Sequence, residues 1–336
     1  MPERGLKQMT ADRDLKVGHF IVEFATPGIG QIIKAAGCDF ALLDTEHSGF
    51  GYETMKSVLR YTQAADLPTI VRVPSKAYHH IARAADMGAE GIMVPMVNSA
   101  DEARQILDSM KYAPQGRRGV ALQIAHDRYL PGPVLDKLAA ANRFTTCFAQ
   151  IETRAGVDNA DEIAALDGVD CLWIGHFDLS CSLGRPGEFG HQDFQDAVAA
   201  VTRACRKHKK ALGRLVPTVE EGIRLYKSGH DFICYSGDVW ALLGAVTEAV
   251  GSIRNGCAAT RAQRRFYRKK TTGGAKASAK PKAAAKPKTS AKSKTSAKPK
   301  TSAKPKTVAK SKAGAKPKAA AKAPRRTGGR GRTAKP

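Results

Sequence analysis

Acidic residues are absent from one end of this chain. No Asp or Glu occurs in residues 264–336, although 26 of the 55 Lys and Arg residues of the sequence lie there. Residues 1–263 therefore hold the other 29 cations together with all 31 acids, which gives a net charge of −2. The formal charge of +24 thus belongs to an appendage, attached to a nearly neutral body that is long enough for one large core.

Three further absences restrict the class of protein. The seven cysteines are scattered, without the C-x-x-C spacing of a zinc or redox site. No run approaches the ~18 apolar residues of a membrane helix, and residues 1–16 lack the apolar core of a signal peptide. We therefore expect a protein of the reducing cytoplasm, with no structural zinc and no membrane partner.

Aromatic residues are absent after Tyr267. The sequence there repeats Lys, Ala, Pro and Ser or Thr, and because prolines interrupt helices and like charges repel, we expect a disordered polycationic tail over 259–336. Without rings that could stack on bases, its contacts would be to phosphates. Residues 264–336 therefore predict nonspecific DNA or RNA binding, and a solubilising tail without a partner is the alternative.

Before the tail, eight short apolar runs alternate with eight helical stretches. Most of the runs are uninterrupted by polar residues, as in strands that are buried on both faces. Eight β-then-α units predict a parallel sheet closed into a (β/α)₈ TIM barrel over 16–258, preceded by an N-terminal extension of 1–15. An open doubly wound sheet is the alternative. The expected strands are 18–24, 40–44, 69–73, 91–96, 147–152, 171–175, 211–216 and 232–236.

Capping patterns and glycines predict where the helices begin and end. N-terminal caps are expected at Thr26 (before Pro27), Ser99, Asn159 and Thr218, the last three because a Glu follows three residues later. Left-handed residues just after helix ends are expected at Gly37, Gly88 and Gly229. A longer insertion, roughly 113–145, is expected to fold over the active-site face.

Polar residues at the ends of the strands are the candidates for chemistry, because barrel active sites lie at the carboxyl ends of the strands. Gln150 and Glu152 are two residues apart and would point to the same side, into the barrel. Asp178 follows the next strand. Two carboxylates from neighbouring strands suit Mg²⁺ or Mn²⁺. The alternative is that Asp178 caps a helix and Glu152 forms a salt bridge.

A cation and a histidine complete the candidate site. Arg72 lies in an otherwise apolar strand, where it needs an anionic partner; it could hold a substrate carboxylate or an enolate, or form an ion pair within the barrel wall. His47 follows Asp44 and Glu46 after the second strand and is a natural general base. Asp86 is the candidate carboxylate to orient it.

Five short motifs resemble the HpcH/HpaI aldolase family, the class II pyruvate aldolases, over roughly 15–255. They are DTEH at 44–47, VRVP at 71–74, GAEGIMVPMV at 88–97, QIET at 150–153 and DLS at 178–180. The resemblance implies a divalent metal, Mg²⁺ or Mn²⁺ with Co²⁺ as a further candidate. It also implies a homohexamer in which a C-terminal helix, here 239–254, packs across a subunit boundary.

The resemblance also assigns roles residue by residue. Glu152 and Asp178 match the metal-binding carboxylates of the family. Gln150 and the backbone at Phe177 match the contacts to the pyruvate moiety. One departure is clear: His176 replaces the proline that many members have before this motif, which affects the shape of the pocket and hence the substrate.

Three further residues match the catalytic machinery of the family. Arg72 matches the arginine that stabilises the enolate, His47 the base, and Asp86 the carboxylate that raises the basicity of that base. The predicted function is a metal-dependent aldolase that cleaves or forms 4-hydroxy-2-oxo acids through a pyruvate enolate. One alternative is an acyl-CoA lyase of the same superfamily. Another is a nucleic-acid-associated protein with a vestigial barrel, against which the retained candidate residues argue.

Overall fold

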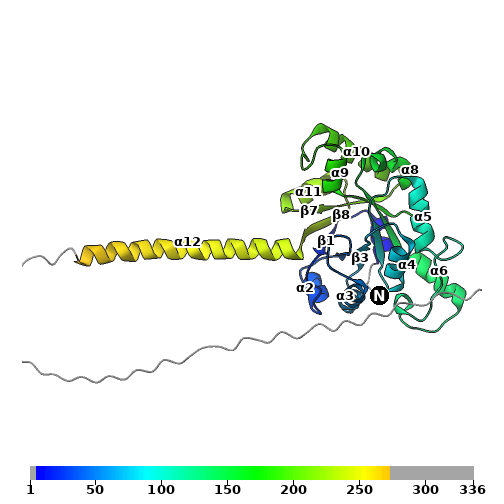
Figure 1. Cartoon of the computed structure of the whole chain (residues 1–336), viewed down its shortest axis with the longest axis horizontal. Coiled ribbons are helices and arrows are strands. Elements are labelled where there is room, and N and C mark those ends of the chain that lie inside the picture. Colours follow the sequence, from blue (N-terminus) through cyan, green and yellow to red (C-terminus); the bar gives the residue numbers. More distant parts are fainter. Residues whose placement is uncertain (1–4, 273–336) are drawn as a thin grey trace, which may run out of the picture. The chain divides into compact units, whose positions relative to one another are not determined.

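Eight parallel strands form a closed barrel in the computed structural model of the chain, which describes residues 5–272. Each strand pairs with the next along the chain, and β8 (Phe232–Gly237) pairs with β1 (Lys16–Ile21) to close the sheet. Helices surround the strands (Figure 1). The predicted (β/α)₈ barrel is therefore confirmed, and the open sheet is excluded.

The strands lie where the apolar runs of the sequence are. The other six are β2 (Phe40–Asp44), β3 (Thr69–Arg72), β4 (Gly91–Val94), β5 (Thr146–Ile151), β6 (Cys171–Ile174) and β7 (Ala211–Val216). Every residue of β2, β4, β5 and β6 is buried, since one side faces the interior of the barrel and the other faces helices.

Most of the helices run back along the outside of the barrel, from the carboxyl end of one strand to the amino end of the next. They are α2 (Ile29–Ala35), α3 (Tyr52–Ala64), α4 (Tyr78–Asp86), α5 (Ala100–Met110), α7 (Arg154–Asp158), α8 (Ala160–Ala164), α9 (His176–Ser182), α10 (Gln192–Lys207) and α11 (Val219–Ser228). The remaining elements are α1 (Leu6–Asp12), the short 3₁₀ helix η1 (Ala125–Asp127), α6 (Val134–Phe144) and α12 (Asp238–Thr272).

Two apolar clusters form the core. One fills the interior of the barrel with large side chains such as Phe40, Phe148 and Phe232, and the other fills the layer between strands and helices. Leu6 and Met9 of α1 belong to the interior cluster. The predicted N-terminal extension therefore contains a helix that contributes to the barrel core.

The predicted helix ends are confirmed in part. Ser99 and Thr218 accept hydrogen bonds from the backbone N–H three residues later, as a capping box requires. Asn159 does not, because it lies between α7 and α8 with a backbone that is almost helical. Thr26 does not cap α2, which begins after Gly28. The three predicted left-handed glycines all have positive φ angles.

The insertion at 113–145 does not cover the active-site face, contrary to expectation. Its helix α6 contacts α1, and α6 and η1 line a cavity with Thr69 and Glu90, which lie at the amino ends of β3 and β4. The segment before them runs along α4, where Arg118 pairs with Asp86. The insertion therefore covers the opposite end of the barrel from the predicted site.

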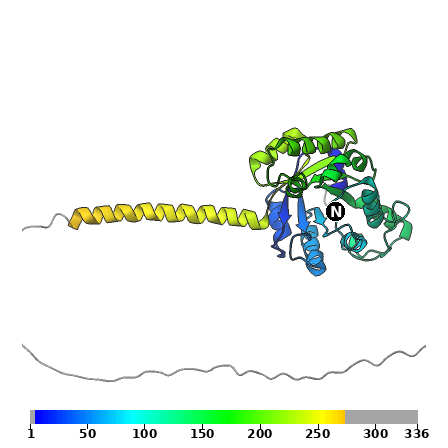
Figure 2. The same cartoon turned by 45° about the horizontal axis from the view of Figure 1, so that its top comes forward.

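The C-terminal helix is longer than the sequence pattern indicated. It continues as one helix to Thr272 (Figure 2), so the expected start of a disordered tail at 259 is wrong for 259–272. This stretch is rich in Arg and Lys, which favour helix, and none of residues 259–280 is proline. The rest of the predicted tail, 273–336, lies outside the described residues. Within the described part, no helix is both long and apolar enough to cross a membrane.

Candidate active site

A cavity of about 340 Å³ lies at the carboxyl end of the strands. It gathers residues from seven of the eight strands or from the segments that follow them, and Trp240 from the start of α12 after the eighth. Five of the predicted site residues line it: His47, Arg72, Gln150, Phe177 and Asp178. These five residues, which come from separate parts of the sequence, therefore meet at the end of the barrel where the pattern predicts the chemistry.

Arg72 is held in place by an aspartate of the neighbouring strand. Asp44 and Arg72 are direct partners in the β2–β3 register, and both point to the interior. The guanidinium donates two hydrogen bonds to the Asp44 carboxylate, Nε to Oδ1 at 2.8 Å and a terminal nitrogen to Oδ2 at 2.9 Å. Asp44 is fully buried and also accepts the backbone N–H groups of Glu46 and His47. Such bidentate pairing fixes the plane of the cation.

The environment keeps Arg72 charged. Burial opposes the charge, but the hydrogen bonds and charge of Asp44, together with the charges of Glu46 and Glu152, outweigh it and raise the pKa of the guanidinium. Nε of Arg72 also lies 3.3 Å from Oε2 of Glu46. A permanent, rigidly held cation at the end of β3 can stabilise an anion that forms in the cavity.

Gln150 and Glu152 lie on the same side of the chain at the end of β5, as predicted. The Gln150 amide donates to one oxygen of Glu152, and the backbone N–H of Met96 donates to the other at 2.6 Å. A side chain at Gly175 would collide with both, because a Cβ there would overlap the Glu152 carboxylate. Glycine at 175 therefore leaves room for this carboxylate.

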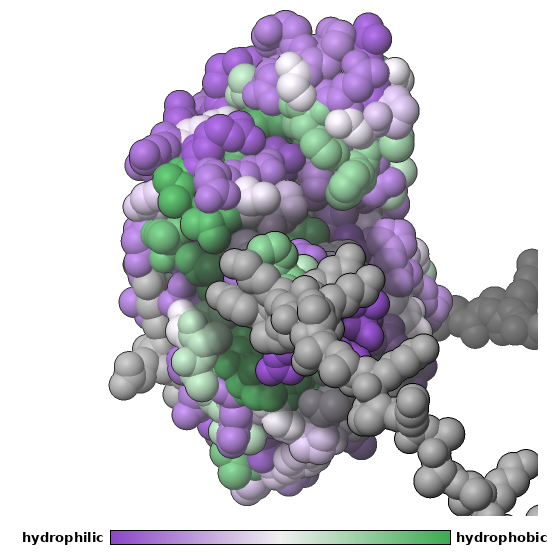
Figure 3. Space-filling view, turned by 90° about the vertical axis from the view of Figure 1, so that its left-hand side faces the viewer, coloured by the Kyte–Doolittle hydropathy of each residue, from purple (hydrophilic) through white to green (hydrophobic). Residues whose placement is uncertain are grey.

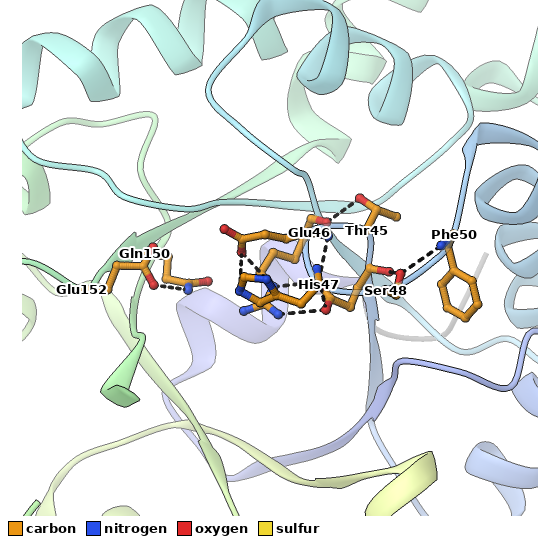
Figure 4. Close-up of polar contacts among 9 residues, drawn as sticks. Thr45, Glu46, His47, Ser48, Phe50, Gln150 and Glu152 are labelled. Carbon is orange, nitrogen blue, oxygen red and sulfur yellow. Dashed lines mark hydrogen bonds and ion pairs between the residues drawn. The ribbon is translucent and has the colours of Figure 1, made fainter. Parts of the chain in front are cut away.

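The half-buried Glu46 and the buried Glu152 face the same space (Figure 4). Burial raises the pKa of Glu152 to about 7, against the hydrogen bonds from Gln150 and Met96, and the charges of Glu46 and Asp178 add to the rise. Burial likewise raises the pKa of Glu46 to about 7; Arg72 opposes the rise, and Asp44 and Asp178 add to it. Repelling carboxylates of this kind are typical of sites that receive a cation or a proton.

Asp178 comes from the first turn of α9, directly after β6. It is exposed and lines the cavity, whereas His176 is buried beside it. The His176 ring packs against the rings of Phe177 and Phe189, at centroid distances of 4.6 and 5.2 Å. Burial, with a contribution from Arg214, lowers the pKa of His176 to about 3, so this ring is neutral at physiological pH.

His47 lies at the mouth of the cavity. Its side chain is 63% exposed, and its Nε2 is 3.8 Å from Oε2 of Glu46. Asp86 is not near it within one chain. Because α4 runs from the carboxyl end of β3 back to the amino end of β4, Asp86 lies at the other end of the barrel, where it pairs with Arg118. The predicted pairing of His47 with Asp86 is therefore wrong for a single chain.

The donor set fits a hard divalent cation. No cluster of three or more His, Cys, Asp or Glu side chains arranged around a common point occurs within 5–272, so protein ligands alone do not enclose an ion. Glu152 and Asp178 supply two carboxylates that influence each other electrostatically. In addition, Oε1 of Gln150 and Oε2 of Glu46 are buried and accept no hydrogen bond. Two carboxylates completed by water and substrate oxygens are the usual arrangement for Mg²⁺.

The structure adds three residues that the sequence reading did not place in the site. From the sequence, Glu46 is only an acid that follows a strand. Its proximity to Glu152 depends on closure of the barrel, which the local pattern does not record. Leu215 and Trp240 also line the cavity, from β7 and from the first turn of α12. Leu215 follows from the alternation of inward residues along its strand. Nothing in the pattern around Trp240 indicated such a role.

Comparison with known proteins identifies the family. The model of the HpcH/HpaI aldolase/citrate lyase family matches residues 18–243. The chain belongs to this family. It is 30% identical over 248 residues to the 5-keto-4-deoxy-D-glucarate aldolase of Shigella boydii serotype 18, covering 74% of this chain and 95% of that protein.

Solved structures of the same family agree. A family protein from Burkholderia cenocepacia J2315 has a TM-score of 0.70 at 31% identity, covering 74% of this chain and 98% of that one. The HpcH/HpaI aldolase from Desulfitobacterium hafniense DCB-2 has a TM-score of 0.71 at 29% identity, covering 75% and 97%. The prediction of a carbon–carbon lyase of the aldolase type is thereby confirmed.

Proposed function

We propose that this aldolase uses a divalent metal to cleave or form 4-hydroxy-2-oxo acids through a pyruvate enolate. The observation that carries the proposal is the convergence of Arg72 and Asp178, which line one cavity, with the Glu152 carboxylate, which accepts a hydrogen bond from the lining residue Gln150. No lysine lines this cavity in the described structure, so a Schiff-base mechanism is not favoured. The family membership supports the reaction class.

Glu152 and Asp178 would hold the metal, Mg²⁺ or Mn²⁺ with Co²⁺ as a further candidate. When bound, the metal would supply a Lewis acid for the oxygens of the 2-oxo acid. Gln150 and the backbone at Phe177 would contact the pyruvate moiety. Arg72 would stabilise the negative charge that develops on the 2-oxo oxygen, because its guanidinium is already oriented by Asp44 before substrate binds.

His47 would act as the base. It would accept the proton of the C4 hydroxyl, directly or through a water molecule, and the bond between C3 and C4 would break. The electron pair of that bond passes into the 2-oxo group and gives the enolate, while C4 becomes the carbonyl carbon of the departing aldehyde. Protonation of C3 then yields pyruvate. The position of His47 at the mouth of the cavity, beside Glu46, supports this assignment.

Asp86 can assist His47 only if another copy of the chain brings it there. Its side chain is 29% exposed, so a neighbouring subunit could approach it. Mixed oligomers of His47→Ala and Asp86→Ala test this, because each would regain active sites if the two residues meet between subunits. If the mixed oligomers are no more active than either single variant, Asp86 does not assist His47, and its role is the ion pair with Arg118.

A homo-oligomer, with a hexamer as the expected form, is supported by apolar surface on α12 and beside it. Leu242, Leu243, Val246, Val250 and Ile253 are exposed and lie on one side of this helix. An apolar groove of about 920 Å³ lies between α2, α11 and the start of α12. Figure 3, drawn from the side of α2 and α11, shows apolar side chains on this face. We infer that α12 packs on the corresponding face of another copy.

The basic segment and the compartment complete the proposal. Residues 264–336, with 26 cations and no acid, would bind nucleic acids through phosphates and without sequence preference. The reducing cytoplasm is the favoured compartment, since all seven cysteines lie in the described part and each is a free thiol.

The proposal is tested by assaying pyruvate release from a panel of 4-hydroxy-2-oxo acids, with and without divalent metal. The panel should include a substrate with a second carboxylate, because the Shigella relative is named for a glucarate. We expect release that EDTA abolishes and Mg²⁺ or Mn²⁺ restores. If only citramalyl or malyl thioesters are cleaved, the protein is an acyl-CoA lyase of the family. EDTA-resistant release would contradict the metal assignment.

A further inference from the structure

The second half of α12 has properties that the barrel lacks. No acid follows Glu248 in the chain, and α12 extends 24 residues beyond it. The family match ends at 243, so this half of the helix lies beyond the matched region. Its described side chains from Glu248 to Phe266 are almost all exposed. They therefore contribute nothing to the core of the described chain.

The arginines of this segment share one side of the helix. At 3.6 residues per turn, the positions of Arg254, Arg261, Arg265 and Arg268 fall within about 60° around the helix axis. We call these four residues the arginine stripe. The uncharged residues Asn255, Ala259, Ala262 and Gln263 lie off the stripe, at about 80° to 180° from Arg254 around the helix axis, and the position of Lys270 also lies on that side. No ion pair joins Arg254, Arg261 or Arg265 to another described residue.

We propose that the arginine stripe is an ordered binding surface for the phosphates of double-stranded nucleic acid. An array of guanidinium groups on a straight helix, about 21 Å long at 1.5 Å per residue, can align with a duplex, which carries one negative charge per roughly 1.7 Å of its axis. The exposed Phe266 lies about 120° from Arg254 around the axis, so the stripe itself carries no aromatic ring with which to stack on unpaired bases. Charge complementarity and rigidity therefore favour a duplex over a single strand.

The stripe would act differently from the residues that follow it. Residues 273–336 contribute many cations, and their contribution depends on total charge. The stripe instead depends on the angular position of each arginine. It also includes Arg254 and Arg261, which precede the basic segment proposed above to bind nucleic acids. The stripe is consequently separable by experiment from the basic segment and from the aldolase activity.

A pair of exchanges tests the stripe at constant net charge. The exchange variant of the full-length protein carries four substitutions. Arg261→Ala and Arg265→Ala remove two guanidinium groups from the stripe. Ala259→Arg and Ala262→Arg restore them at positions off the stripe, so the net charge is kept and only helix-forming residues are used. The control replaces Lys276 and Lys280 by Gln, which removes two charges without touching the stripe. Binding to a fluorescent 24-base-pair DNA duplex is measured between about 50 and 200 mM KCl, a range over which phosphate contacts weaken strongly.

We expect the exchange variant to bind the duplex at least several-fold more weakly than wild type. The slope of log K against log salt should fall by up to about 2, at roughly 0.9 per lost phosphate contact. The control should lose less affinity. Equal affinity and slope in the exchange variant and wild type would contradict the proposed role of the arginine stripe. The basic segment would then be the binding element. Preference for single-stranded DNA of the same length would overturn the duplex assignment. Pyruvate release should be unchanged in both variants.

Discussion

Carboxylates occupy both ends of the barrel, but they have different partners. At the amino end, an acid directly precedes each even-numbered strand and accepts a backbone N–H. These acids are Asp39, Glu90, Asp170 and Asp231, which accept from Val17, Leu6, Cys147 and Leu212 respectively. At the carboxyl end, Glu152 likewise accepts the N–H of Met96, but Oε2 of Glu46 is buried and accepts no hydrogen bond.

The difference separates structural acids from acids that can receive a ligand. A carboxylate that satisfies a strand N–H stabilises the sheet, and it has little freedom to bind anything else. Glu46 and Glu152 repel one another and Asp178 across an open cavity, an arrangement that costs stability unless a cation occupies it. Glu152 also accepts a backbone N–H, that of Met96, so the mutual repulsion of its carboxylate with those of Glu46 and Asp178 is what distinguishes this end of the barrel.

Removal of the fixed cation should have the largest effect on turnover. Arg72→Ala is expected to lower kcat by roughly 10²–10⁴-fold or more, because the charge that stabilises the enolate is lost. Arg72→Lys keeps a charge but not the two-pronged contact with Asp44, so partial activity is expected. Steady-state kinetics on a responsive substrate check both. Wild-type turnover in Arg72→Ala would show that Arg72 only forms an ion pair within the barrel wall.

Loss of the base should lower turnover by no more than loss of the cation. His47→Ala is expected to slow cleavage by roughly 10²–10⁴-fold, as for a lost general base. His79→Ala is the matched control, since His79 is an exposed histidine at the start of α4. Full activity of His47→Ala would mean that the base lies elsewhere, and His176 would be the next residue to test.

Metal binding should become stronger as pH rises toward 8. The pKa of Glu152 is raised to about 7, so at pH 5.5 this carboxyl is mostly protonated in the folded protein and cannot ligate. A raised carboxyl pKa also means that the metal-free fold loses stability as pH rises from about 4.5 through 7. The increase in Tm on adding Mn²⁺ should therefore be small at pH 5.5 and large at pH 8. An equal increase at both values would contradict the assignment.

Removal of an acid at the amino end should affect stability and leave turnover intact. Asp170 accepts the N–H of Cys147 at 2.9 Å and pairs with Lys7 at 2.6 Å. Asp170→Ala should lower the free energy of unfolding by about 1–3 kcal/mol, because a buried N–H loses its acceptor. Urea denaturation measures this, with the exposed Asp167→Ala as control. A comparable loss of kcat would remove the distinction between the two ends.

Much of the fold follows from the sequence because strands buried on both faces are uninterrupted apolar runs. Seven of the eight predicted strands begin within one residue of their positions in the structure, and the first is displaced by two. The period of two along a strand likewise correctly placed Gln150 beside Glu152. These features depend only on local geometry, which a single sequence records.

The errors concern relations that local pattern does not record. Asp86 is close to His47 in motif order but lies at the other end of the barrel, because the helix that carries it reverses the direction of the chain. The partner of Arg118 could not be inferred for the same reason. The charge of the C-terminal stretch predicts disorder from 259, whereas α12 continues to Thr272 because residues 259–272 contain helix-favouring residues and no proline.

The most direct test of the account is Mn²⁺ binding measured beside turnover in three proteins: wild type, Glu152→Gln and Asp170→Asn. Both substitutions preserve the volume of the side chain and remove one charge, at opposite ends of the barrel. We predict one Mn²⁺ per wild-type chain, with metal-dependent pyruvate release. Both should be lost in Glu152→Gln and kept in Asp170→Asn. Metal binding and turnover that survive in Glu152→Gln would contradict the assignment of the catalytic metal to the carboxyl end.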